Sequence, residues 1–335
     1  MDIRAFREGD EEGILALDRA VEEHPWNRRD LANWRWKYRG GNPAGDAIMY
    51  VAEHEGRIVA HFAGLPMRYV VGGEPARGSH SLAMMVLPQW QNRGLIKFVA
   101  DKVLADISAA GWAFTYGYPN QNAHALHTRL LGYEDVGMQR LWQRSLDGQE
   151  MDLSIMSASA TPGLDFRALS VFGPEADALF ARVLSAKDGP APGAVVVRDA
   201  AFLNWRYMAR PDVRYLAHGV FRGEELAGYC VLKLYRWEDT LFGHFVDLFA
   251  VPGDVEAGRL LLGGGLRELH GHGCGLVNLW MQGSLFFQNL LREHGFAEVS
   301  SRPLICRFGK TSERLRPSLT PEKWYFTMGD TLEIY

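Results

Sequence analysis

The chain of 335 residues contains no run of about 20 apolar residues, which is the length that a helix needs to cross a bilayer. The segment from Met1 to Asp10 also lacks the apolar core of a secretory signal. These absences argue against export and against a membrane partner. We therefore expect a cytoplasmic protein.

Cysteine is scarce: Cys230, Cys274 and Cys306 lie far apart and show no Cys-x-x-Cys spacing. An odd, dispersed set does not form a disulfide framework, and it fits a reducing compartment. His270 and His272 lie close to Cys274, but no fourth zinc ligand accompanies them. The sequence therefore predicts neither a disulfide scaffold nor a metal site.

Positive charge is not in excess, because 36 Lys and Arg residues face 40 Asp and Glu residues, for a net charge of −4. Such a chain has no general field that would attract nucleic acid, so we expect no nucleic-acid partner. A hydrophobic content of 47% over this length is enough for two cores. The composition is that of an ordinary globular protein.

The most informative segment spans residues 82–97, LAMMVLPQWQNRGLIK. It predicts an apolar strand, a tight basic turn and the start of a helix whose apolar residues continue at helical spacing to Ile107. The first amides of such a helix have no partner within it, and they attract anions. Arg93 and Lys97 add positive charge, and Gly94 lets the backbone approach a ligand closely. The turn is suited to a pyrophosphate, which would also explain a lysine in the first helical turn.

This segment resembles the signature of the GCN5-related N-acetyltransferases (GNAT), Gln/Arg-x-x-Gly-x-Gly/Ala, whose backbone amides hold the pyrophosphate of acetyl-CoA. The first four positions match, whereas Ile96 replaces the small final residue. The resemblance implies acetyl-CoA as cosubstrate. The residues of the turn that it implies in binding are Gln91, Asn92, Arg93, Gly94, Leu95, Ile96 and Lys97.

A second GNAT-like feature follows in order: a strand over 113–118, the segment Pro119-Asn120-Gln121-Asn122, and a helix over 123–131 that stops at Gly132. We expect Asn122 to start this helix. In the family this strand splays from its neighbour, and the wedge between the two admits the pantetheine arm. The resemblance places Met84, Met85 and Val86 on one side of the wedge, and Tyr116, Tyr118 and Asn120 on the other. Asn122 would meet the cofactor near its pantetheine or phosphate.

The chain also repeats itself. Trp36-Lys37-Tyr38 before Asn42-Pro43 corresponds to Trp205-Arg206-Tyr207 before Arg210-Pro211. This offset is too long for a solenoid and fits a duplicated domain. We expect a mixed α/β (α+β) protein of two tandem GNAT-like domains, 1–148 and 160–335, with a boundary between Asp147 and Pro162. Each would have a mostly antiparallel twisted sheet, flanking helices and a splayed strand pair.

The second half lacks the phosphate-binding turn. Its counterpart strand, 244–251, is followed by Pro252-Gly253-Asp254-Val255-Glu256, which carries acids where arginine and glycine stand in the first half. An acidic turn repels pyrophosphate. We expect this half to brace the other or to shape the acceptor site.

Acetyl transfer to an amine requires a base to remove a proton, donors for the oxyanion and a group that stabilises the leaving thiolate. In many family members a tyrosine on the helix after the splayed strand serves the thiolate, and His127 stands at that position here. His80, expected at the start of the central strand, is the first candidate for the base. His61 and Tyr118 are alternatives. A backbone amide near Met85 is expected to bind the oxyanion.

The sequence does not identify the acceptor, because a fold does not determine the second substrate. The tandem subgroup that the chain resembles favours a small-molecule amine or amino sugar, including a nucleotide or polysaccharide precursor. A protein lysine, another small metabolite and a longer acyl donor are alternatives, as is a non-catalytic acyl-CoA sensor or assembly module. Trp34, Trp36 and Tyr38 could line an acceptor funnel. Asp330, in an expected final strand and turn, could hold the amine. We expect a monomer or homodimer.

Overall fold

The computed structural model describes residues 1–21, 30–146, 162–186, 191–309 and 312–332. They form two compact units: Met1–Gly137 with Arg302–Pro317, and Met138–Ser301 with Ser318–Thr331. Each unit is a largely antiparallel sheet flanked by helices, so the expected α/β fold class is confirmed. The expected boundary at Asp147 to Pro162 falls almost entirely on 147–161, outside the described residues.

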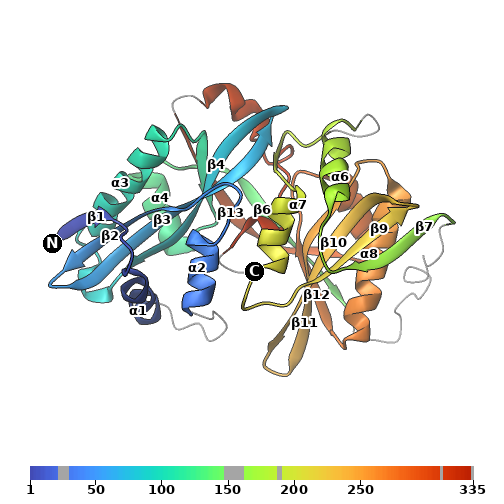
Figure 1. Ribbon diagram of the computed structural model, residues 1–335, viewed down its shortest axis with the longest axis horizontal. Coiled ribbons are helices and arrows are strands. Elements are labelled where there is room, and N and C mark those ends of the chain that lie inside the picture. The colour runs from blue at the N-terminus through green and yellow to red at the C-terminus, as the bar shows by residue number, and fades with distance from the viewer. Residues whose placement is uncertain (22–29, 147–161, 187–190, 310–311, 333–335) are drawn as a thin grey trace. The chain divides into compact units, whose positions relative to one another are not determined.

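The first unit has the sheet order β1-β2-β3-β4-β5-β13, in which all neighbours are antiparallel except β4 and β5, which are parallel. In Figure 1, α1 and α2 lie on one face of this sheet and α3 and α4 on the other. The elements are β1 (Asp2–Ala5), α1 (Glu11–Val21), α2 (Leu31–Arg39), β2 (Ile48–His54), β3 (Arg57–Val71), β4 (Glu74–Val86), η1 (Pro88–Trp90), α3 (Leu95–Ala109), β5 (Phe114–Gly117), α4 (Gln121–Leu130) and, from Arg302 onward, β13 (Ala297–Phe308), with η3 (Glu313–Ser318) beginning after it.

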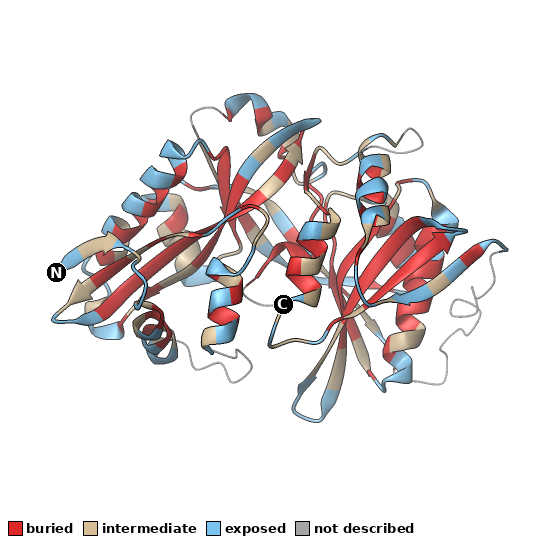
Figure 2. Ribbon diagram, viewed as in Figure 1, coloured by how far each residue is buried: buried red, intermediate tan, exposed pale blue. Residues whose placement is uncertain are grey.

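The helices of the first unit follow the apolar periodicity of the sequence. In α3 the residues Val99, Val103, Leu104 and Ile107 recur at helical spacing and are buried against β2 and β3. Figure 2 shows the resulting pattern, with buried stripes on helices that are otherwise exposed. No helix in the described part of the chain is both long enough and apolar enough to cross a membrane.

The second unit has the sheet order β6-β12-β11-β10-β9-β7, with β11 and β12 as its parallel pair. Helix α8 packs on β9, β10 and β11, and α6 also packs on β10. The elements are β6 (Glu134–Ser145, from Met138 onward), β7 (Leu164–Leu169), α6 (Pro174–Leu184), β8 (Ala194–Val196), α7 (Ala200–Leu203), the π-helical η2 (Asn204–Met208), β9 (Leu216–Arg222), β10 (Glu225–Trp237), β11 (Thr240–Ala250), α8 (Val255–Gly271), β12 (Leu276–Trp280), α9 (Leu285–Glu293) and η4 (Met328–Asp330).

Each sheet is completed by a strand from the other half of the sequence. In the first unit β13 pairs with β5, with Ile305 opposite Gly117. In the second unit β6 pairs with β12, with Trp142 opposite Leu279. The two units are therefore not consecutive stretches of chain. Apolar periodicity predicts that a strand exists but does not specify its partner, so this exchange was not foreseen.

The expected splayed strand pair is present in both units. In the first, β4 and β5 pair from Gly78 with Phe114 to His80 with Tyr116, and β4 then continues from Ser81 to Val86 paired with β3 and no longer with β5. In the second, β11 and β12 pair from Phe242 with Leu276 to Phe245 with Leu279, and β11 then continues from Val246 to Ala250. A parallel pair that separates in this way leaves a wedge between two strand edges.

Candidate active site

The turn after β4 directs backbone amides outward. η1 follows the strand, and Asn92 and Gly94 then adopt left-handed backbone conformations with φ of 59° and 73°. Gly94 is the N-cap of α3, and no atom lies within 4 Å of the position that a Cβ would take. A left-handed φ favours glycine. The Leu95 and Ile96 amides precede the first hydrogen bond of α3, which the Lys97 amide makes to the Gly94 carbonyl at 3.0 Å, so the turn presents donors to an anion.

Two side-chain contacts connect this turn to the strand and to η1, and the turn is exposed to solvent. The Gln91 side-chain amide donates to the Val86 carbonyl at 3.1 Å, and the Arg93 guanidinium lies over the Trp90 ring at 5.3 Å. Residues 91–94 are exposed. Lys97 pairs with Asp101 at 2.6 Å, so a carboxylate one helical turn away already accounts for a lysine at this position. Arg93 is an exposed cation within the turn itself.

The end of β4 that no longer pairs with β5 carries a bulge. His61 of β3 stands opposite Met85, and Ala63 stands opposite Leu82, so that Ala83 and Met84 together face one residue of β3. Ala83 takes a left-handed φ of 49°. A bulge re-aims backbone groups beside a site. At the bulge and after it, Met84 and Val86 are half-exposed and Met85 is buried. This leaves an accessible edge on the wedge.

His61 supports the bulge. Its Nδ1 lies 3.0 Å from the Ala83 carbonyl oxygen, which can only accept, so Nδ1 carries the proton. Burial lowers the pKa of His61 to about 4, although the bond to Ala83 acts in the opposite direction. His61 is therefore neutral near pH 7. Its Nε2 lone pair is buried and has no hydrogen-bond partner among the described residues.

Across the wedge, α4 begins two residues earlier than expected. Asn120 is its N-cap, and its side chain accepts from the Ala123 amide at 2.9 Å. Asn122 instead lies within the first helical turn and is exposed, so the expectation that it starts the helix is wrong. Two asparagines so close together both suit a cap, and periodicity does not resolve one helical position from the next. Asn120 and Asn122 both follow closely after the end of β5, the strand that forms one side of the wedge.

His127 is buried on α4. Its Nδ1 lies 2.8 Å from the Ala123 carbonyl and therefore holds the proton, which leaves a lone pair on Nε2. Burial lowers the pKa of His127 below its ordinary value. The ring meets Tyr133 edge-on at 4.9 Å. Near neutral pH this imidazole is a proton acceptor, and it can donate from Nε2 only after taking up a proton.

Tyr133 connects α4 to the open end of β4. Its hydroxyl lies 2.6 Å from the Ser81 hydroxyl, and burial raises the pKa of Tyr133 above its usual value, so it stays protonated. Ser81 is the first residue of β4 after the parallel pairing ends. A Cβ built on Gly117 of β5 would touch the Ser81 Cβ at 3.6 Å, which places Ser81 at the apex of the wedge. This pair is not predictable from the sequence, because no local pattern links residues so far apart in the chain.

His80 lies in the middle of β4, not at its start, because the β3–β4 hairpin is longer than the apolar run suggested. Its ring is buried and stacks on Tyr116 at 4.9 Å, and Tyr118, the other alternative, lies edge-on at 6.3 Å. Successive strand residues point to opposite faces. His80 therefore lies on the opposite face of the sheet from Ser81 and from the α4 side that holds His127.

A small cavity of about 40 Å³ opens beside the bulge, lined by α1, α2 and β4. Ala83 and Met85 form its floor, and Trp34 and Tyr38 line its wall, 5.2 Å apart. Further lining residues include Asp18, Asp30, Asn33 and Lys37. Two of the three aromatic residues expected at an acceptor funnel thus reach it, whereas Trp36 is buried and does not line the cavity.

Two other expectations lie away from this site. Asp330 does not hold an acceptor, because it is fully buried in the second unit and pairs with Arg198 at 2.8 Å. The tail is also not a regular strand: it makes isolated bridges at Trp324 and Phe326 and then forms η4. Among the described residues no group of three or more His, Cys, Asp or Glu side chains is arranged to hold a metal ion.

Comparison with known proteins agrees with this geometry. The family model described as an acetyltransferase (GNAT) domain matches residues 2–135, the stretch that contains β4, the turn and α4. Among curated protein sequences none matches the chain.

Several solved structures share the fold over 92% of this chain. A GCN5-related N-acetyltransferase from Anabaena variabilis is similar with a TM-score of 0.66 at 14% identity, over 73% of its own length. A probable N-acyltransferase from Enterococcus faecalis has a TM-score of 0.64 at 12% identity, over 72% of its length. A tandem GNAT protein from the clavulanic acid biosynthesis pathway has a TM-score of 0.60 at 14% identity and is covered over 98%. At such identities the likeness concerns the fold.

Proposed function

We propose that the first unit, in which residues 2–135 match the acetyltransferase (GNAT) domain model, transfers an acetyl group from acetyl-CoA to a primary amine by direct attack in a ternary complex. The observation that carries the proposal is the split of β4 from β5 next to an exposed turn of outward amides. The turn suits the pyrophosphate, and the wedge suits the pantetheine arm.

The residues present fit this cosubstrate. Arg93 and the amides of residues 92–96 offer positive charge and donors without a competing carboxylate in the turn, since Asp101 is engaged by Lys97. The half-exposed edge at Met84 and Val86 offers backbone groups to the amides of the arm. Asn120 and Asn122 stand across the wedge. Met84 and Met85 provide an adaptable apolar lining for the acyl group.

The acceptor is proposed to enter from the α1–α2 side. The cavity there ends on Ala83 at the bulge and combines aromatic rings with the carboxylates of Asp18 and Asp30. Aromatic faces and carboxylates bind an ammonium group, and carboxylates also accept hydrogen bonds from hydroxyl groups. We therefore favour a small hydroxylated primary amine, such as an amino sugar or its nucleotide or polysaccharide precursor.

Proton handling is divided between the two faces of the sheet. His80 is proposed as the base, directly or through a water, because it shares its face with the acceptor cavity; His61 is the alternative. The amine loses a proton to this base as it attacks, and an amide near Met85 binds the oxyanion. On the other face, the leaving thiolate has two candidate donors: His127, and the Ser81–Tyr133 hydroxyl pair. Because the pKa of His127 is lowered, we favour the hydroxyl pair near neutral pH.

The test is a panel of primary amines, including amino sugars, polyamines and a lysine peptide, incubated with the protein and acetyl-CoA while release of free CoA is followed. Acetyl-CoA alone should raise the melting temperature, and at least one hydroxylated amine should release CoA. A shift without release on any amine would favour an acyl-CoA sensor. No shift at all would refute cofactor binding.

A further inference from the structure

The wedge of the second unit is already filled by the chain itself. We propose that residues 324–331, here called the plug, occupy the position of the pantetheine arm, so that this unit carries a permanent internal substitute for CoA. The inference rests on the proposed function of the first unit, because it identifies the wedge as a cofactor site. The proposal predicts that each chain binds one CoA molecule and that the plug stays bound in the wedge of the second unit.

The plug binds one side of the wedge through its backbone. Gln282 lies two residues after the end of β12, and it exchanges two backbone hydrogen bonds with Phe326 at 3.1 and 3.2 Å. The preceding Met281 amide donates to Arg140 of β6, on the other edge of β12. Since successive strand residues direct their backbone groups to opposite edges, Gln282 faces β11. Phe326 therefore lies between the diverging strands.

The plug also binds the opposite side of the wedge. The Tyr325 hydroxyl donates to the Leu248 carbonyl of β11, and the Thr327 hydroxyl donates to Asp247 at 3.0 Å. In the first unit Met84 and Val86 of the equivalent stretch of β4 are half-exposed, whereas Val246 to Ala250 of β11 are all buried. The plug thus binds a backbone carbonyl and a carboxylate of β11 as well as the backbone that follows β12.

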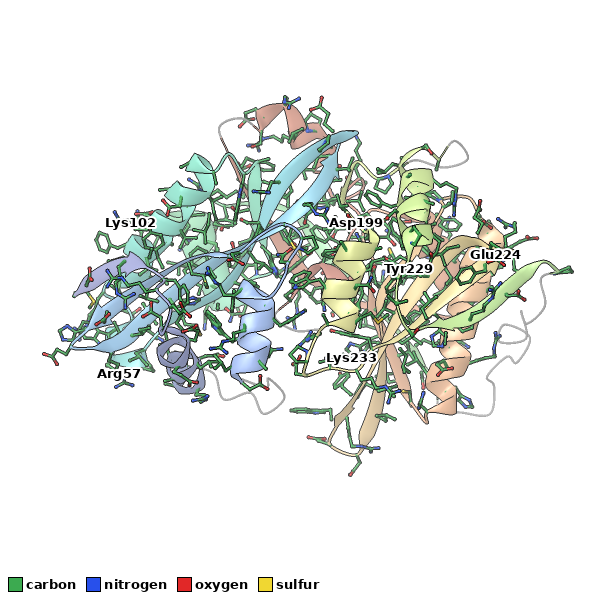
Figure 3. The ribbon with its side chains drawn as sticks, viewed as in Figure 1. Arg57, Lys102, Asp199, Glu224, Tyr229 and Lys233 are labelled. Atoms are coloured by element: carbon green, nitrogen blue, oxygen red, sulfur yellow. The ribbon has the colours of Figure 1, made fainter. Side chains whose placement is uncertain are left out.

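A buried charge network anchors the plug. Arg198 pairs with Asp330 at 2.8 Å and with Asp247 at 3.3 Å, and all three side chains are excluded from solvent. Tyr207 and Tyr229, the latter labelled on β10 in Figure 3, donate to Asp247 at 3.0 and 2.9 Å. Burial acts to lower the pKa of Arg198, but the two carboxylates raise it well above its ordinary value. Every charge in the network has a partner, and release of the plug would remove Asp330, the carboxylate 2.8 Å away, from the buried Arg198.

The position of the pyrophosphate is filled as well. Asp254 is the N-cap of α8, and its carboxylate accepts from the Ala257 amide at 3.1 Å and pairs with Arg222 at 3.1 Å. In the first unit the cap of the corresponding helix is Gly94, which has no side chain. A carboxylate at this position satisfies a helix amide that would otherwise bind phosphate.

Gly283 gives a steric test of the plug. A Cβ on this residue would lie 2.1 Å from the Trp324 carbonyl oxygen, and its φ is 70°. Gly223, in the β9–β10 turn, has a similar φ of 63° but no atom within 4 Å. Gly283→Ala should therefore destabilise the chain much more than Gly223→Ala, which imposes the same backbone strain without the clash. Equal melting temperatures for the two variants would contradict the packed plug.

The deciding experiment is hydrogen–deuterium exchange of the full chain with and without saturating acetyl-CoA. Without it, the amides of Gln282 and Phe326 should exchange as slowly as those in the centre of β11. With it, protection should rise over 84–97 and stay unchanged over 246–257 and 324–331, and titration should give one equivalent. Two equivalents, faster exchange of the plug, or new protection at 253–258 would overturn the inference.

The two proposals fail separately. If acetyl-CoA protects neither unit, the proposed function fails, while slow exchange at Phe326 and the difference between the glycine variants still support the plug. If acetyl-CoA protects 84–97 but Phe326 exchanges as fast as an unstructured peptide, the plug fails and the proposed function stands.

Discussion

Reversing the charge of Arg93 should weaken acetyl-CoA binding without unfolding the chain. Arg93 is exposed in the turn, where its structural contact is the Trp90 ring at 5.3 Å. An exposed cation–π contact contributes only about 0.5–1 kcal/mol to folding. The melting temperature of Arg93→Glu should therefore change little. Any large loss of binding in this variant would then reflect the turn itself.

The size of the effect follows from the exposure of the group. A hydrogen bond between charged groups contributes roughly 1.5–3 kcal/mol, and solvent screening favours the lower end. The glutamate removes this bond and adds repulsion, so we expect a loss of about 2–3 kcal/mol, or ~30- to ~150-fold in Kd. Arg93→Gln, which removes the charge without repulsion, should lose about tenfold.

The assay is calorimetric titration with acetyl-CoA at fixed ionic strength, and Arg77→Glu is the matched control. Arg77 is an exposed residue near the start of β4, and the strand between it and Val86 is about 30 Å long. This separation exceeds the Debye length of ~8 Å at physiological salt. An unchanged Kd for Arg93→Glu, or an equal loss in Arg77→Glu, would refute binding of the pyrophosphate at this turn.

Three further predictions concern the protons and the acceptor. Because the folded pKa of His61 is about 4 and the unfolded value is 6.5, the unfolded chain binds the extra proton; stability should fall by about 3 kcal/mol as pH drops from 7 to 4. Urea unfolding should show a shallower pH dependence for His61→Gln, and an unchanged slope would contradict the buried neutral ring. Tyr133→Phe should lower kcat about tenfold near pH 8 with an unchanged Kd for acetyl-CoA. His127→Gln should retain most activity there; the reverse order would make His127 the donor. Asp18→Asn should raise the acceptor KM, whereas Glu12→Gln, an exposed carboxylate on the same helix, should not; equal effects would move the acceptor elsewhere.

The parts of the site that the sequence predicted are local. The strand, turn and helix around Gly94 follow from a short apolar run, a glycine and a helical apolar face. A left-handed cap and outward amides depend on few neighbouring residues. The spacing of the apolar residues and the glycine in the sequence is therefore sufficient to predict this turn. The same reasoning predicts a start of α4 at Asn122, whereas Asn120 caps the helix, because local propensity does not separate two good caps that lie two residues apart.

The parts that were missed depend on contacts between distant residues. Ser81 and Tyr133 meet only because α4 returns its end to β4, and the β5–β13 pairing brings Ile305 beside Gly117. The sequence alone leaves Asp330 as a candidate for holding the acceptor amine. Its partner, Arg198, is far away in sequence and becomes apparent only in the folded unit.

The two wedges differ in what satisfies their strand edges. When parallel strands diverge, their backbone donors and acceptors lose partners, and buried backbone groups require replacements. In the second unit Phe326 pairs with Gln282, Tyr325 binds Leu248, and these groups are buried. In the first unit the edge at Met84 and Val86 is half-exposed, where water or a ligand can satisfy it. A wedge that is kept accessible in one copy and closed by its own chain in the other distinguishes a binding unit from a supporting unit, independently of the acidic residues that first suggested the difference.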